Sequence, residues 1–213
     1  MAQSKFVSIL LNHKLFVGMV AAFGVFVVGL LIYMQFFMPL PQASELVLYP
    51  LTRPTVNFPL EINVVKGDFN LQQQKVLNSC VNNWKEKSNG VVDIKLNMDW
   101  NAPKPFSEIN YLNFGQKTLW MRDSNDPEVL MLKLKSSMIA DGVSKGDFIM
   151  VINDKNEVDL DKLYIIVLHE ISHQLGLEHI KPEYPALMNL GGNNGVITKY
   201  DLVVLCSLYK CKE

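Results

Sequence analysis

Three of the four histidines in the chain lie within residues 168–180, which read LHEISHQLGLEHI. Residues four apart lie on one face of a helix, so His169 and His173 are expected to point the same way and to share one metal ion. Neutral imidazole is a borderline ligand that suits Zn²⁺. Glu170 lies beside the first histidine and can reach a water molecule on the metal without binding the metal itself. The spacing predicts a catalytic zinc site.

Gly176 and His179 extend this pattern. A helix that continued past Leu175 would turn position 179 away from the histidine pair, whereas a glycine can adopt the left-handed conformation that ends a helix. The chain can then turn back and bring His179 to the same ion. Three histidines leave the fourth zinc position open for water, which is typical of catalytic sites. The alternative is a group of surface or capping histidines near a helix end.

These positions match the signature H-E-x-x-H-x-x-G-x-x-H without gaps, so the chain resembles the metzincin metalloproteases. The family also carries a methionine turn after the third histidine. Met188, in the stretch YPALMNL, occupies that place. The resemblance implies that Met188 forms an apolar floor beneath the zinc, while an ordinary core methionine is the alternative.

Within the metzincins the chain is most similar to the matrixin group, over about residues 59–210. The similarity lies in the active-site helix from Asp159 onward, in the stretch PALMN and in ITKYDLVVLCSLY; before Asp159 it concerns only the order of the elements. It implies an α+β, zincin-like fold with a mixed twisted β-sheet, an active-site helix with a second helix packed on it, and a C-terminal helix. Three departures concern His13, Ile180 and Leu190. His13 precedes an apolar span, so no histidine remains for the second, structural zinc of matrixins. Leu190 replaces a tyrosine ligand found in the astacin group, and Ile180 stands where other groups carry a polar residue.

The activity that the resemblance implies is hydrolysis of peptide bonds in a protein or peptide substrate, with one Zn²⁺ and with Glu170 as general base. The substrate is expected to lie along an edge strand, for which DFIMVIND at residues 147–154 is the candidate. Tyr184 and Tyr200 flank the methionine turn and are candidates for stabilising the oxyanion, unless they merely pack. Two other classes are a catalytically silent zinc-binding module of the same fold and a tethered structural protein without metal. The intact Glu170 argues against the silent module.

The elements that must position these residues follow from local patterns. The periods of apolar residues predict a sheet domain with helices on one side. The expected strands cover residues 60–65, 91–100, 117–123, 129–135 and 147–154, and the expected helices cover 70–90, 159–176 and 198–210. Thr198 and Asp201 resemble a capping box at the start of the last helix, with Asp in place of the usual Glu.

Residues 15–38 are uncharged and almost wholly apolar. About 20 such residues cross a bilayer as a helix, and the apolar core of a cleaved signal peptide is shorter, at roughly 7–15 residues. We therefore expect a single-pass membrane anchor rather than a signal peptide. Lys5 and Lys14 precede the span and Arg53 is the first basic residue after it, which predicts a cytoplasmic tail at 1–14 and a catalytic domain outside the cytoplasm. The prolines of residues 39–58 indicate an extended or partly ordered tether, followed by the catalytic domain at 59–213.

The net charge is −1, and no basic run with interleaved aromatic residues occurs, so the sequence offers no case for nucleic-acid binding. Cys80, Cys206 and Cys211 all follow the apolar span. In an oxidising compartment one pair could form a disulfide, and the odd number leaves one thiol over. Three buried apolar cysteines are the alternative, and the sequence does not choose between the pairings.

Overall fold

The structure is a computed structural model of residues 1–213 that forms two compact units, Met1–Leu40 and Pro41–Glu213. It describes residues 19–30, 32–33, 39–51, 55–101, 116–123, 125–127, 129, 142–153, 159–189 and 195–211.

In the first unit, residues 19–30 and 32–33 are helical, with exposed apolar side chains such as Phe23 and Val25. The rest of the predicted anchor at 15–38 and the tail at 1–14 lie outside the described residues. Among the residues that the structure describes, no helix is both long enough and apolar enough to cross a membrane. The membrane anchor therefore stays a prediction from the sequence.

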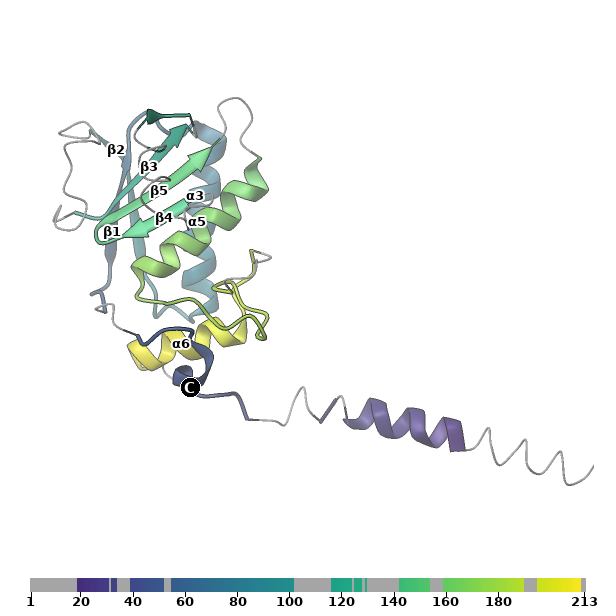
Figure 1. Ribbon diagram of the computed structural model, residues 1–213. Coiled ribbons are helices and arrows are strands. Elements are labelled where there is room, and N and C mark those ends of the chain that lie inside the picture. Colours follow the sequence, from purple (N-terminus) through teal and green to yellow (C-terminus); the bar gives the residue numbers. More distant parts are fainter. Residues whose placement is uncertain are drawn as a thin grey trace, which may run out of the picture. The chain divides into compact units, whose positions relative to one another are not determined.

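The second unit is a mixed α/β domain built on a five-stranded sheet in the order β2-β1-β3-β5-β4 (Figure 1). The first four strands in this order run parallel, and β4 is antiparallel to β5. The strands are β1 at Leu60–Val65, β2 at Ile94–Trp100, β3 at Thr118–Asp123, β4 at Gly142–Lys145 and β5 at Phe148–Asn153. The predicted mixed sheet is confirmed, while the expected strand at 129–135 lies almost wholly outside the described residues.

The strand predicted at 147–154 as an edge of the sheet lies inside the sheet, between β3 and β4. The corresponding strand, β5, pairs with β3 along its whole length and with β4 from Phe148 to Val151. Its consecutive residues from Phe148 to Ile152 are all buried. A run of apolar residues without alternation is typical of a strand inside a sheet, so the prediction of an edge was wrong for a reason visible in the sequence. Among the described strands, β4 is the outermost at this end of the sheet.

The described part of the domain also holds three long helices: α3 at Leu71–Lys87, α5 at Leu160–Gln174 and α6 at Lys199–Tyr209. Each begins at a capping side chain. Asn70 accepts hydrogen bonds from the N–H groups of Gln72 and Gln73, and Asp159 does the same for the first turn of α5. Thr198 and Asp201 form the predicted capping box of α6. These caps confirm the three helices expected from the sequence.

Helices α3 and α5 contact each other, and each also contacts strands of the sheet, so both cover the same face. The alternation in β1 matches this arrangement, because Leu60, Ile62 and Val64 are buried and the residues between them are not. The shared core joins the sheet, the two helices and the loop after α5. Helix α5, which carries His169 and His173, is thus held by packing.

Most of the described residues of the segment predicted as a tether, from Pro41 onward, belong to this domain. The compact unit begins at Pro41, and the short helix α2 at Ala43–Leu46 contacts α6 (Figure 1). Leu46 is fully buried and Val47 is 7% exposed. The sequence did not reveal this packing, because the segment is rich in proline and its apolar residues follow no helical period. The folded domain therefore starts before Pro59.

The structure resolves the cysteine pairing. Cys206, in the last turns of α6, forms a disulfide with Cys211 just beyond the helix end. Cys80 is a free thiol buried in α3. Its Sγ lies 3.5 Å from the backbone oxygen of Tyr164 in α5, at the contact between the two helices. The disulfide therefore closes a local loop rather than joining distant helices.

Candidate metal centre

The end of α5 shapes the metal centre. Gly176 adopts φ +85°, its N–H donates to the carbonyl of His173, and the N–H of Leu177 donates to the carbonyl of Ser172. These two bonds define a Schellman motif, which requires a left-handed residue that glycine adopts without strain. The helix-ending role predicted for Gly176 is confirmed. The turn reverses the chain and returns His179 toward the helix.

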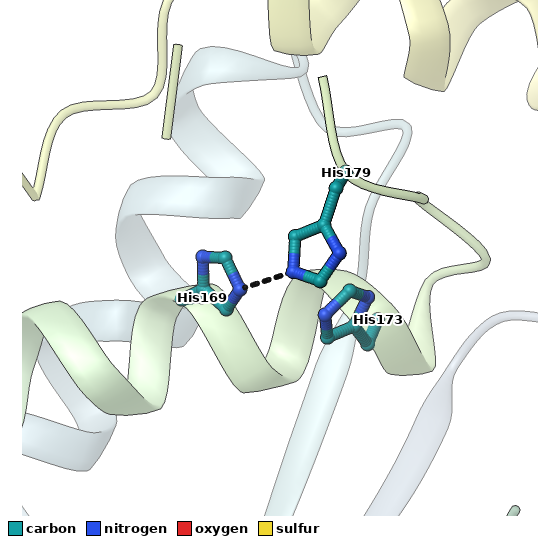
Figure 2. A group of neighbouring side chains, drawn as sticks. All are labelled: His169, His173 and His179. Carbon is teal, nitrogen blue, oxygen red and sulfur yellow. Dashed lines mark hydrogen bonds between the residues drawn. The ribbon is translucent and has the colours of Figure 1, made fainter. Parts of the chain in front are cut away.

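The three histidines converge as the spacing predicts (Figure 2). Their candidate ligand nitrogens all lie within 4.8 Å of one another. The ring centroids of His169 and His173 are 5.0 Å apart, and that of His179 lies 5.3 Å and 4.8 Å from them. His173 is buried, whereas His169 and His179 are half-buried. The three side chains lie close enough to bind a metal ion that remains within reach of solvent.

Backbone carbonyls orient two of the rings. Nδ1 of His169 lies 3.1 Å from the oxygen of Leu187, and Nδ1 of His173 lies 2.8 Å from the oxygen of Leu177. A carbonyl oxygen only accepts hydrogen bonds, so each Nδ1 carries the proton and each neutral ring presents an Nε2 lone pair to its neighbours. Such carbonyls typically fix the tautomer of metal-binding histidines.

One pair of ring nitrogens has the spacing that tetrahedral zinc requires. Nε2 of His169 and Nε2 of His179 are 3.3 Å apart (Figure 2). Two ligands at about 2.0–2.1 Å from a tetrahedral Zn²⁺ are separated by about 3.3–3.4 Å. The same distance also fits a hydrogen bond in which His179 donates to His169. The three histidines can therefore hold a metal ion, and imidazole is a donor that suits zinc among other transition metals.

The turn around Met188 lies directly behind the histidines. Met188 is fully buried, and its backbone oxygen accepts the N–H of Ile180, the residue after the third histidine. The carbonyl of the neighbouring Leu187 is the partner of His169. Burial among core residues also explains why Ile180 is apolar, since its side chain is fully buried. The turn of Met188 therefore contacts the loop of the third histidine, while the role of its side chain as an apolar floor beneath the zinc stays a prediction.

Asp201 is a residue of this centre that the sequence reasoning assigned only to helix capping. Its carboxylate is fully buried and accepts the N–H groups of Leu187 and Met188 at 2.9 and 3.0 Å. It also accepts the N–H and the hydroxyl of Thr198. Asp201 thereby connects α6 to the turn that orients His169. The one signal in the sequence was the shorter Asp at the third position of a capping box.

Glu170 is 7% exposed and faces strand β4. A Cβ placed on Gly142 would lie 2.8 Å from Oε1 of Glu170 and 2.7 Å from Cγ2 of Ile166. Glycine is therefore the residue that leaves room for the carboxylate between β4 and α5. Beside it, Nε2 of Gln174 donates to Oγ of Ser144 at 2.7 Å, which holds the two elements in register.

Tyr184 and Tyr200 pack ring against ring, with centroids 5.2 Å apart, and both lie against the core. Lys199 covers the ring of Tyr200, with Nζ 5.3 Å from its centroid. Both tyrosines therefore pack, as the alternative to an oxyanion role expected. Their contribution to an oxyanion stays a prediction.

Comparison with known proteins adds no relative to this picture, because no protein-family model and no curated protein sequence matches the chain.

Proposed function

We propose that the chain is a zinc-dependent endopeptidase of the metzincin type, most similar to the matrixin group, with a zincin-like fold. The observation that carries the proposal is the convergence of His169, His173 and His179 around one point, with Glu170 next to the first ligand on the same helix. The open fourth position of a three-histidine site favours catalysis over a structural role.

The chain's own residues divide the reaction among them. Zinc, when bound, lowers the pKa of water and polarises a carbonyl oxygen. Glu170 takes the proton from the attacking water and delivers it to the leaving amine, as a general base and then a general acid. The carbonyls of Leu187 and Leu177 hold a proton at Nδ1 of His169 and His173, so Nε2 of each ring is the atom that would bind the metal. The low exposure of Glu170 excludes bulk water from the proton transfer.

The peptide substrate is proposed to add to strand β4. This strand is outermost among the described strands at its end of the sheet, and it lies against the active-site helix. An extended peptide that pairs with an outer strand gains backbone hydrogen bonds regardless of its sequence. Since Gly142 of β4 is next to Glu170, a peptide paired with this strand would pass close to the general base.

The sequence adds a proposed location. The apolar residues 15–38 would anchor the chain in a membrane with the catalytic domain on the extracytoplasmic side. Resistance of the full chain to extraction from membranes by alkaline carbonate tests the anchor separately from catalysis. Release into the soluble fraction would overturn this part of the proposal.

The competing function is a silent zinc-binding module of the same fold. Full-length wild type and Glu170→Gln separate the two when zinc content and cleavage of a mixed peptide library are measured on the same samples. The protease predicts one zinc in both proteins and a loss of about 10²–10⁴-fold in cleavage by the variant. Equal zinc with no cleavage by wild type supports the module. Folded protein that binds no zinc contradicts both.

A further inference from the structure

The segment ahead of β1 contacts the loop that carries the third histidine. We define the N-terminal arm as residues 43–48, which comprise α2 and the two residues after it. The N–H of Leu48 donates to the carbonyl of His179 at 2.8 Å, and the N–H of Lys181 donates to the carbonyl of Leu46 at 2.9 Å. Val47 and Ile180 form the antiparallel bridge between these bonds.

Residues 179–181 are held from the opposite side as well. Ile180 forms a parallel bridge with Asn189, and its N–H donates to the carbonyl of Met188 at 2.8 Å. The loop therefore runs between the arm and the methionine turn as the middle strand of a small ladder. Leu46 and Val47 bury their side chains in the same core as Ile180 and Met188, so the ladder is also packed.

His179 depends on this ladder more than the other two histidines do. His169 and His173 lie on α5, where the helical hydrogen bonds fix the backbone. His179 lies beyond Gly176 in the stretch 177–179, which has no regular structure and no helical hydrogen bonds. Its backbone is positioned where its carbonyl meets the N–H of Leu48.

A second set of contacts joins residues 55–58, further along the chain, to the end of α5, the helix that carries His169 and His173. The hydroxyl of Tyr209 accepts the N–H of Val56 at 3.1 Å and donates to the carbonyl of Leu175 at 2.8 Å. Leu175 is the C-cap of α5, two residues after His173. The ring of Tyr209 also packs on Phe58, with centroids 5.1 Å apart. The chain ahead of β1 thus contacts the loop of His179 directly and the end of α5 through Tyr209.

We infer that the N-terminal arm is a positioning element of the metal centre, which sets the place of His179 through the backbone N–H of Leu48. This inference rests on the proposed zinc site. Loss of a group that orients a metal ligand typically lowers metal affinity about 10–100-fold. The position of the arm is therefore expected to influence the affinity of the site for zinc.

The test compares Leu48→Pro with Leu48→Ala in the full chain. Proline removes the N–H that reaches His179, whereas alanine keeps it and shortens the side chain. Val47 already has φ −72° and ψ +144°, the conformation favoured before proline, so the substitution is tolerated by its neighbour. Zinc affinity is measured by competition with a chelator. We expect a loss of about 10–100-fold for Leu48→Pro and a change within about twofold for Leu48→Ala.

The outcomes separate this inference from the function on which it rests. Wild-type affinity in a folded Leu48→Pro variant overturns the role of the arm and leaves the zinc site intact. A folded wild type without zinc overturns the proposed function itself. If Leu48→Pro does not fold, amide hydrogen exchange in the wild type decides the matter. Stronger protection of the Leu48 and Lys181 amides in the presence of zinc supports the inference, and exchange at the rate of an unstructured peptide in the zinc-bound protein overturns it.

Discussion

At the scale of single residues, the space around Glu170 is as important as its charge. The Cβ of an alanine at position 142 would lie within 3 Å of atoms of Glu170 and Ile166, so the carboxylate would have to move. A misplacement of about 1 Å at a reacting group costs about 10²-fold in rate. Strand β4 thus leaves room for the proposed general base through the absence of a side chain at Gly142.

We predict that Gly142→Ala lowers kcat by about 10²-fold and leaves zinc content unchanged. The measurement is steady-state cleavage of a peptide substrate together with metal analysis. Gly24→Ala is the matched control, because a Cβ at Gly24 meets nothing within 4 Å. Unchanged kcat in the Gly142 variant would show that Glu170 does not need its present position.

The sequence predicted the site residues that lie close together along the chain. Helical spacing and one glycine were sufficient to place His169, His173 and His179. Their partners could not be predicted in the same way, because the carbonyls of Leu177 and Leu187 belong to the backbone and leave no mark in residue type. The second role of Asp201 was hidden because it depends on a contact with a turn elsewhere in the chain.

At the scale of elements, α6 supports the metal centre through one buried carboxylate. We predict that Asp201→Asn lowers the free energy of unfolding by about 3 kcal/mol, because an amide cannot accept all the hydrogen bonds that Asp201 accepts from the methionine turn and Thr198. Urea unfolding measures the change. Glu183→Gln, at an exposed position, is the control. A loss below about 0.5 kcal/mol would contradict the structural role of Asp201.

The helix pair α3 and α5 protects the free thiol between them. Burial raises the pKa of the Cys80 thiol, so little reactive thiolate forms at neutral pH. We expect no labelling of native protein by iodoacetamide, one labelled cysteine after unfolding, and all three after unfolding with reductant, by mass spectrometry. Labelling of Cys206 or Cys211 without reductant would contradict the disulfide.

The elements themselves were predictable where a period and a cap coincide, as in α3, α5 and α6. The order of the strands was not, because register and neighbours are set by contacts between distant segments. Strand β5 is an example. Its uninterrupted apolar residues indicate a strand inside the sheet, but only its pairing with β4 shows that β4 is the outer neighbour.

At the scale of the whole molecule, metal binding and folding are expected to be coupled. The ligands lie on α5 and on the loop after it, and the loop is held by the arm and by the methionine turn. Zinc at about 100 times its Kd would stabilise the folded state by about 2.7 kcal/mol.

For a domain of this size we therefore predict that chelation lowers the midpoint of thermal unfolding by about 5–10 °C. Differential scanning calorimetry of the full chain, with and without excess chelator, measures the shift. His179→Ala serves as the control, since its midpoint should respond little to chelator. Equal shifts in both proteins would place the metal elsewhere.

The arm also sets where a functional domain begins. A chain starting at Pro41 retains the arm, whereas one starting at Pro59 loses the contacts to His179 and Tyr209. We predict that the longer chain folds and binds zinc and that the shorter one binds at least about tenfold more weakly. Equal zinc affinity of the two chains by chelator competition would contradict this boundary. The sequence alone suggested the shorter domain, because the burial of Leu46 and Val47 is a property of the tertiary fold.

The most direct test of the central claim is the zinc content of the purified, folded full chain, measured by elemental mass spectrometry beside His173→Ala. We expect one zinc per wild-type chain and less than about a tenth of that in the variant, since two histidines cannot complete the site. Folded wild-type protein that holds no zinc after equilibration with the metal, or a variant that keeps a full complement, would contradict it.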